Sequence, residues 1–339
     1  MILAITPGDP EGIGPEVAWK TLLNRPRGLS RVHLLCVGAR EPFDRLGVPV
    51  HEIGLDEIVS GEARPPRSRE PLVWLLKAPS VAPRLGAKKA HLPGFQSGWS
   101  IEQATGLVKR GVASALATGP ISKERLQKGG YLYPGHTEFL ASLCGVKRVT
   151  MMLANETLRV SLVTTHLALQ EVSKNLGRAD VELCIRHTVT HLRDWWGIAA
   201  PRVAVLGLNP HSGEAGLFGR EEIRVISPAI SAMKRKHGLN ATLSGPHPAD
   251  TLFAKHVMAK PKDRYDAVVC MYHDQGLIPV KLLDFPRTVN VTLGLPIVRT
   301  SVDHGVGFDI AGQGIADPSS LQAALGLALK ISRNRRPHS

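Results

Sequence analysis

Three histidines stand at the ends of short apolar runs. His166 ends the run 163–166, His211 follows the run 205–210, and His273 follows the run 268–272. If these runs are neighbouring parallel strands, their carboxyl ends meet at one edge of a sheet and the imidazoles converge there. Three imidazoles with one open position suit Zn²⁺ or a similar divalent cation acting as a Lewis acid. A structural or solvated role is the alternative for each, because the chain contains 14 histidines.

Two carboxylates lie close to these histidines in the sequence. Asp250 stands in the turn-like segment 245–251, and Asp274 directly follows His273. A carboxylate beside a metal can orient a ligand, complete the coordination or take a proton. The alternatives are a helix N-cap for Asp250 and a solvated loop residue for Asp274.

Anion-binding chemistry is indicated elsewhere. The segments 117–123 and 134–138 read as turns that open helices, where free backbone N–H groups attract phosphate or carboxylate. Helix capping by Ser122 or Thr137 is the alternative. Three polar residues flank a later strand-like run and can also bind a charged ligand: Lys281, Asn290 and Arg299. The alternative for each is an ordinary surface side chain.

The elements that must position these residues alternate along the chain. Strands are predicted for the apolar runs Ile2–Ile5, Val32–Val37, Val112–Ala117, Arg159–Thr164, Val203–Leu208, Ala267–Met271 and Val289–Leu293. Helices are predicted for Ala179–Trp195, Glu221–Lys236 and Leu321–Ile331. This alternation predicts an α/β fold with a mostly parallel sheet.

Two further features bear on the fold. Residues 60–71 and 77–99 are rich in Pro, Gly, Ser and basic residues, which predicts surface loops or a flap. The glycines Gly8, Gly12 and Gly14 follow the first strand, but their spacing differs from Gly-x-Gly-x-x-Gly. A standard Rossmann fingerprint is therefore not expected.

The composition limits the function classes. The formal net charge is +13, yet the basic residues are spread along the chain, and the densest group is the tail Lys330, Arg333, Arg335 and Arg336. Such a surface attracts phosphorylated substrates and dinucleotides, whereas nucleic acid is not an expected partner.

The compartment is predicted from cysteines and targeting signals. The four cysteines form no CxxC pair and lie in or beside apolar runs, as buried free thiols in a reducing compartment do. Neither a signal peptide nor an apolar run of membrane-spanning length is recognisable. We therefore expect a cytoplasmic protein without a membrane partner.

Six segments, in order along nearly the whole chain, resemble the 4-hydroxythreonine-4-phosphate dehydrogenase family of pyridoxal phosphate biosynthesis. They are Thr6–Glu16, Thr118–Lys123, Gly135–Glu138, Asn209–Glu214, Tyr272–Gly276 and Thr300–Gly305. The resemblance implies a two-lobed fold akin to isocitrate and isopropylmalate dehydrogenases. Residues 1–125 with 280–339 would form the dinucleotide lobe, and residues 126–279 the metal and dimer lobe. It also implies an obligate homodimer with its site at the subunit interface.

The resemblance also implies roles for individual residues. His166, His211 and His273 would bind one divalent cation (Zn, Mg or Co), with one histidine supplied by the partner subunit. The substrate would be held by His136, Thr137, Lys281, Asn290 and Arg299. Within the segment 304–312, which resembles an adenosine-binding loop, His304, Gly305 and Asp309 would contact NAD or NADP. Asp250, Asp274 and Lys281 are the candidates for catalytic proton transfer.

The implied reaction is NAD-dependent oxidation of 4-phosphohydroxy-L-threonine at C3, with decarboxylation to 3-amino-2-oxopropyl phosphate. A paralogue could instead oxidise another four-carbon phosphorylated acid, such as phosphothreonate or phosphoerythronate. Two further possibilities belong to different classes: a metal-dependent phosphatase and a non-catalytic anion-binding protein. The chain has Val306 and Gly307 where the family usually has Thr and often Ala, a departure that bears on the dinucleotide contacts.

Overall fold

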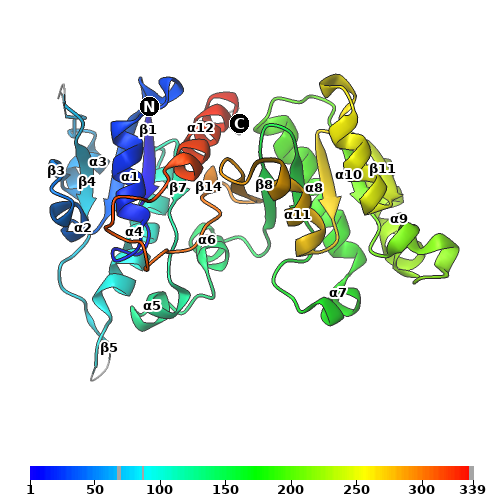
Figure 1. Cartoon of the computed structure of the whole chain (residues 1–339), viewed down its shortest axis with the longest axis horizontal. Coiled ribbons are helices and arrows are strands. Elements are labelled where there is room, and N and C mark those ends of the chain that lie inside the picture. Colours follow the sequence, from blue (N-terminus) through cyan, green and yellow to red (C-terminus); the bar gives the residue numbers. More distant parts are fainter. Residues whose placement is uncertain (67–69, 86–87, 336–339) are drawn as a thin grey trace. The chain divides into compact units, whose positions relative to one another are not determined.

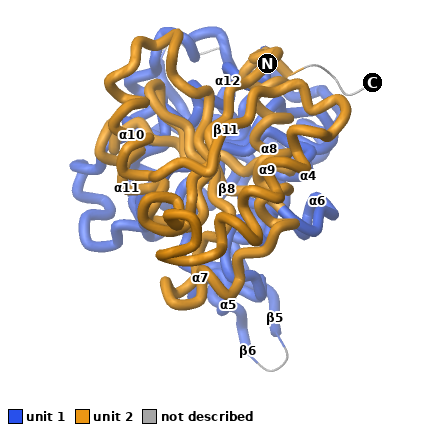
Figure 2. The backbone as a smooth tube through the Cα atoms, turned by 90° about the vertical axis from the view of Figure 1, so that its right-hand side faces the viewer, with its two compact units in different colours: residues 1–148, 295–333 blue, residues 149–294, 334–339 orange. Residues whose placement is uncertain are grey.

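The computed structural model describes every residue except 67–69, 86–87 and 336–339. The chain forms two compact units, shown in different colours in Figure 2. Unit 1 contains residues 1–148 and 295–333, and unit 2 contains residues 149–294 and 334–339. The predicted division into two lobes is thus observed, but the divisions fall later than the expected 125/126 and 279/280.

Packing explains these later divisions. Helices α5 (Lys123–Lys128) and α6 (His136–Cys144) pack on α4 (Leu92–Lys109) of unit 1. Helix α11 (His273–Asp284) packs on strands of unit 2. Residues 126–148 therefore belong to unit 1 and residues 280–294 to unit 2, because these segments include the helices that pack there.

Unit 1 is built on parallel strands in the order β14-β7-β1-β2-β4-β3. The strands are β1 (Ile2–Thr6), β2 (His33–Gly38), β3 (Val50–Ile53), β4 (Val73–Lys77), β7 (Ala115–Thr118) and β14 (Arg299–Ser301). The other helices are α1 (Gly14–Leu23), α2 (Glu41–Arg45), α3 (Leu55–Ser60) and α12 (Ser319–Asn334), as Figure 1 shows. A short antiparallel hairpin consists of β5 (Arg84–Leu85) and β6 (Lys88–Lys89).

Unit 2 has the strand order β11-β10-β12-β9-β8-β13. Its strands are β8 (Thr150–Ala154), β9 (Arg159–Leu162), β10 (Arg202–Leu206), β11 (Thr242–His247), β12 (Ala267–Cys270) and β13 (Val289–Leu293). Strands β11, β10, β12 and β9 are parallel, whereas β8 runs antiparallel to both its neighbours. The remaining helices are α7 (Leu169–Asn175), α8 (Arg178–Asp194), α9 (Ser227–Arg235) and α10 (Ala249–Met258).

The alternation of side chains along β9 places helices on both faces of the unit 2 sheet. Val160 and Leu162 pack in a core cluster with Leu252 of α10 and Val280 of α11. Ser161 points to the opposite face and accepts a 2.8 Å hydrogen bond from Thr188 of α8. Both faces are thus covered, as is usual for parallel sheets, and the polar chemistry is left to the strand ends.

All seven predicted strands and all three predicted helices are present. The loop prediction for residues 77–99 is wrong over its last part, because α4 begins at Leu92. Its glycines resemble loop residues, but Gly94 lets α4 approach α5: a Cβ there would lie 1.7 Å from the carbonyl oxygen of Arg125. Parts of the two predicted loop segments, residues 67–69 and 86–87, lie outside the described residues, as does Arg336 of the basic tail.

The free cysteines bear on the expected compartment. All four cysteines are free thiols; Cys36, Cys184 and Cys270 are buried as expected, and Cys144 is half-buried. Among the described residues, no helix is both long enough and apolar enough to cross a bilayer.

The close contact at Gly94 provides a test of the packing. We expect Gly94→Ala to lower the free energy of unfolding by about 1–3 kcal/mol, because the methyl group forces α4 away from α5. Gly106→Ala in the same helix is the control, since its Cβ would meet only the flexible Arg110 side chain, at 3.3 Å. That change should stabilise the helix by about 0.5–1 kcal/mol. Urea unfolding of both variants checks this, and equal effects would contradict it.

Candidate functional site

Two of the three predicted metal-binding histidines lie together in unit 2. His166 follows β9, and His273 begins α11 after β12. Their ring centroids are 5.8 Å apart. Both line a cavity of about 400 Å³, whose other lining residues are Thr165, Leu167, Leu169, Val172, Tyr272 and Asp274.

Asp274 orients one ring of this pair. Its Oδ1 lies 2.7 Å from His273 Nδ1, so Nδ1 donates to the carboxylate and Nε2 remains as the nitrogen that can face a ligand. Metal-bound histidines commonly show this carboxylate–imidazole arrangement, which fixes the tautomer and makes the imidazole a stronger donor.

Side-chain hydrogen bonds hold the strand ends beneath the pair. Gln275 accepts the backbone N–H of Met271 at 2.6 Å and donates to the carbonyl of Gly207 at 2.7 Å, so it joins the ends of β12 and β10. Thr164, after β9, donates its hydroxyl to the carbonyl of Met271 at 2.7 Å. Both side chains are buried. The sequence patterns predicted a role for neither residue.

His211 lies in a strained segment of the same unit. It belongs to the turn η2 (Pro210–Gly216), in which the residues 211–215 all have positive φ, between 41° and 81°. Four of these five residues are not glycine, and a left-handed conformation costs each such residue roughly 1–2 kcal/mol. Strain of this kind persists where the surroundings enforce it, often at functional sites. The His211 ring lies 6.2 Å from the Phe218 ring.

The donor set of this region suits a divalent cation, but it is incomplete. Among the described residues, no group of three or more His, Cys, Asp or Glu side chains is placed to hold a metal ion. His166 and His273 supply two imidazoles of the type that Zn²⁺ and similar cations prefer. The pair therefore has donors of the right type, and the described part of one chain places no third such side chain with them.

The other predicted residues of unit 2 lie on three elements. Asp250 is the exposed second residue of α10, and because Pro248 is the N-cap, the alternative that Asp250 caps the helix is wrong. Lys281 is in the last turn of α11, with its ammonium 5.5 Å from the centre of the Phe285 ring. It follows His273 by eight residues, which is roughly 12 Å along a helix axis. Asn290 is half-buried in β13.

In unit 1, Arg299 is buried at the start of β14, with 2% of its surface exposed. Its Nη2 and Nε donate to Thr118 Oγ1 at 2.7 and 3.2 Å. Burial lowers the pKa of this guanidinium to about 9. The group nevertheless stays protonated at neutral pH, so Arg299 presents a buried positive charge that favours an anionic ligand.

His136 is the neighbour of this charge in unit 1. It begins α6, and its buried Nε2 has no hydrogen-bond partner. Burial, and then the positive charge of Arg299, lower the pKa of His136 well below its usual value. The neutral imidazole and the guanidinium together can bind a phosphate or a carboxylate, which would give the orphaned ring nitrogen a partner.

The two helix openings differ in how they are capped. Ser122 accepts the backbone N–H of Arg125 at 3.3 Å, which confirms its alternative role as the cap of α5. Thr137 is the second residue of α6, whose N-cap is Gly135, so Thr137 is not the cap.

The segment 304–312 lies against the N-terminal loop of unit 1. The backbone N–H of Ile13 donates to the carbonyl of Val306 at 2.9 Å. Gly307 has a φ of +54°, and a Cβ there would be 3.0 Å from the Ile13 side chain, so glycine suits this position. His304 Nδ1 lies 2.9 Å from its neighbour's carbonyl, that of Gly305, and Asp309 is exposed.

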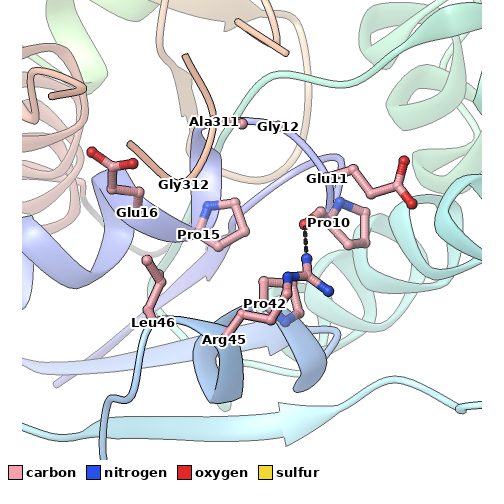
Figure 3. A pocket seen from close by; sticks show the side chains of 10 residues that line it. All are labelled: Pro10, Glu11, Gly12, Pro15, Glu16, Pro42, Arg45, Leu46, Ala311 and Gly312. Atoms are coloured by element: carbon pink, nitrogen blue, oxygen red, sulfur yellow. Dashed lines mark hydrogen bonds between the residues drawn. The ribbon is translucent and has the colours of Figure 1, made fainter. Parts of the chain in front are cut away.

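A cavity of about 460 Å³ opens beside this segment (Figure 3). It is lined by Pro10, Glu11, Gly12, Pro15, Glu16, Pro42, Arg45, Leu46, Ala311 and Gly312. Arg45 donates one hydrogen bond to the carbonyl of Pro10 at 3.2 Å. The walls of the cavity are mainly proline, glycine and leucine, and its charged side chains are Arg45, Glu11 and Glu16. Of the predicted adenosine-binding segment, the last two residues line this cavity, whereas His304, Gly305 and Asp309 do not.

Asp9 is a buried carboxyl group of unit 1 for which the sequence patterns predicted no role. It follows β1, is 1% exposed, and accepts the backbone N–H of Glu11 at 3.0 Å. Arg125 lies 3.3 Å away, yet burial raises the pKa of Asp9. Asp9 lies in the family-like segment 6–16, which could have marked it as a candidate functional residue. Its burial, however, cannot be inferred from the neighbouring residues alone.

The low pKa of His136 predicts a pH dependence of stability. Below about pH 6.5 the unfolded chain binds a proton at His136 that the folded chain does not, so stability is lost as the pH falls. The slope from this residue approaches about 1.4 kcal/mol per pH unit. Urea unfolding without ligands, at pH 7.5 and 5.5, should show a smaller decrease for His136→Asn than for the wild type. An unchanged decrease would show that this imidazole is not held neutral.

Comparison with known proteins identifies the family. The model of the family described as pyridoxal phosphate biosynthetic protein PdxA matches residues 70–328. A 4-hydroxythreonine-4-phosphate dehydrogenase of a Ruegeria species is 43% identical over 99% of this chain and 98% of its own length. A provisionally named D-threonate 4-phosphate dehydrogenase of Bradyrhizobium diazoefficiens is 41% identical over 97% of this chain and 96% of its own.

A solved structure agrees with these relatives. The crystal structure of 4-hydroxythreonine-4-phosphate dehydrogenase from Klebsiella pneumoniae superposes with a TM-score of 0.83 at 38% identity, covering 98% of each chain. The family match spans more than half of the chain, and the similarity to the relatives extends through both units. This chain therefore belongs to the PdxA family.

Proposed function

We propose that this chain oxidises 4-phosphohydroxy-L-threonine at C3 with NAD⁺ and a divalent cation, and that the product loses CO₂ to give 3-amino-2-oxopropyl phosphate. The supporting observation is the 43% identity over 99% of the chain to a relative named for this substrate. The matched length extends through the segments that carry the histidine pair of unit 2 and the Arg299–His136 pair of unit 1.

The side chains divide the work by their chemistry. His166 and His273 would hold the cation with His211, one of the three histidines coming from the partner subunit, while Asp274 keeps His273 in the right tautomer. Arg299 and His136 would bind an anionic group of the substrate with Thr137. Lys281 and Asn290 would complete the contacts to the substrate.

The reaction balances as two steps. When bound, the cation would polarise the C3 hydroxyl oxygen and the dinucleotide would accept a hydride from C3. The hydroxyl proton leaves to a base, for which Asp250, Asp274 and Lys281 are the candidates, directly or through water. The C1–C2 bond to the carboxylate then breaks, its electron pair passes to the new C3 carbonyl, and CO₂ leaves. C2 then takes up a proton as the C3 carbonyl re-forms, which gives 3-amino-2-oxopropyl phosphate.

The dinucleotide would bind in unit 1. His304 and Asp309, with Gly305, remain the proposed contacts to the adenosine, and the cavity of Figure 3 lies next to their segment. The guanidinium of Arg45 in that cavity can donate hydrogen bonds to either a pyrophosphate or a 2′-phosphate. NAD and NADP are therefore both candidate cofactors. The free thiols, three of them buried, support the cytoplasm as the compartment.

A homodimer is part of this proposal, because the histidine pair lacks a third donor within one chain, as far as the described residues go. Helix α11, which begins at His273, carries the exposed apolar side chains Ile278 and Leu282, and its C-cap is the exposed Phe285; they are 57%, 81% and 60% exposed. Their spacing of four and three residues places them on one face of the helix. An exposed apolar stripe along the helix that begins at His273 fits a second copy of this chain.

The dimer proposal predicts a linked loss of assembly and metal. Leu282→Glu places a charge in the stripe, so it should produce monomers and weaken cation binding by at least tenfold. Met258→Glu is the control, because Met258 is an equally exposed apolar residue, 86% exposed, on a different helix, α10. Sedimentation and a metal titration measure the two effects. If the monomeric variant keeps full metal affinity, the partner subunit supplies no metal ligand, and this part of the proposal is refuted.

The reaction is tested with a substrate panel. Purified protein should reduce NAD⁺ or NADP⁺ in the presence of 4-phosphohydroxy-L-threonine, lose this activity after chelation, and regain it when Zn²⁺, Co²⁺ or Mg²⁺ is added. D-threonate 4-phosphate is the competing substrate, because the Bradyrhizobium relative carries that name. A higher kcat/KM for it would transfer the proposal to that acid. Phosphate release without dinucleotide reduction would indicate a phosphatase.

A further inference from the structure

Glu222 is a buried carboxylate in unit 2 that the proposed reaction does not use. It begins the π-helical turn η3 (Glu222–Ile226) and is 3% exposed. Its Oε1 accepts the backbone N–H groups of Leu208 and Asn209, at 2.7 and 2.8 Å. Its Oε2 accepts the side-chain amide of Asn209 at 3.0 Å. All three donors thus come from two adjacent residues.

Those two residues connect the end of β10 to His211. After them comes Pro210, and the chain then enters the left-handed residues 211–215. Glycines enclose the carboxylate on both sides of His211: a Cβ on Gly207 would lie 2.9 Å from Oε1, and one on Gly213 would lie 2.6 Å from Oε2. The space around Glu222 is therefore shaped to the path of this loop.

The neighbouring carboxylate extends the link to the histidine cavity. Glu221 Oε2 accepts the side-chain amide of Asn209 at 2.8 Å, and its Oε1 accepts the hydroxyl of Ser173 in α7. Helix α7 supplies Leu169 and Val172 to the cavity that His166 and His273 line. Asn209 is thus held by two carboxylates, one of which also reaches the helix beside the histidine pair.

We propose that Glu222 is a positioning residue for His211: it holds residues 208–209 and so fixes the direction in which the strained turn presents its imidazole to the cation. This inference rests on the proposed function, in which His211 is a metal ligand. Changes to groups that orient a metal ligand typically weaken metal affinity by about 10–100-fold. A merely structural Glu222 would change stability and leave the metal affinity alone.

The test measures Co²⁺ affinity of the metal-free, full-length protein through the visible absorption of the bound ion, with Zn²⁺ competition. We expect Glu222→Ala to weaken binding about 10–100-fold. Glu222→Gln keeps one accepting oxygen and the same shape, so it should weaken binding less. Asn155→Ala is the matched control in unit 2, because Asn155 Oδ1 likewise accepts two backbone N–H groups, from Thr157 and Leu158, at 3.0 and 2.9 Å.

A second measurement needs no metal. Amide hydrogen exchange in the metal-free protein should be faster at residues 208 and 209 in Glu222→Ala, because their N–H groups lose the carboxylate. Asn155→Ala should leave exchange there unchanged. If Glu222→Ala does not fold, the same two measurements on Glu222→Gln decide the question.

The outcomes separate the two proposals. Wild-type Co²⁺ affinity in a folded Glu222→Ala, with stability lowered as in Asn155→Ala, would overturn the positioning role. His211→Ala tests the ligand assignment independently and should abolish Co²⁺ binding. Full affinity in His211→Ala would overturn that assignment and the role of Glu222 with it. A loss in His211→Ala with none in either Glu222 variant would leave the proposed function standing and refute only the positioning residue.

Discussion

The chemistry of unit 2 depends on hydrogen bonds that close the gaps between strand ends. Gln275 bridges β12 and β10 through Met271 and Gly207, and the hydroxyl of Thr164 joins the end of β9 to the same residue, Met271. Parallel strands leave backbone groups unpaired where they end, and a buried unpaired group costs about 1–3 kcal/mol. By satisfying these groups with side chains, the fold fixes the loops that carry the histidines.

Much of this arrangement was predictable because it follows from local patterns. The seven apolar runs became strands because β-branched and aliphatic residues bounded by Gly, Pro or Asn leave few other conformations open. The placement of His166 and His273 together follows from the same rule, since both stand after strands that are parallel neighbours, β9 and β12. The loop assigned to 77–99 failed where glycine served close helix packing rather than flexibility.

What could not be predicted is burial of charge and backbone strain. A single glutamate at position 222, an aspartate at position 9 and an arginine at position 299 look like surface residues in a sequence, yet all three are buried. Their burial depends on other segments that pack against them: the loop 208–209 contacts Glu222, and Thr118 of the distant strand β7 contacts Arg299. Likewise, no residue type at 211–215 except Gly213 signals a left-handed turn.

The turn that holds His211 is strained, and the His166–His273 pair is an incomplete set of metal donors. A turn held in an unfavourable conformation returns energy when it relaxes, so it presents His211 in one direction only while its surroundings remain intact. The histidine pair, in turn, supplies two donors and lacks a third among the described residues of one chain. A site completed by a second subunit would make cation affinity depend on protein concentration, because anything that binds only the assembled form stabilises it. Cation binding, dimer assembly and the left-handed conformation of residues 211–215 would then be coupled. Patterns in the sequence of a single chain cannot reveal such coupling.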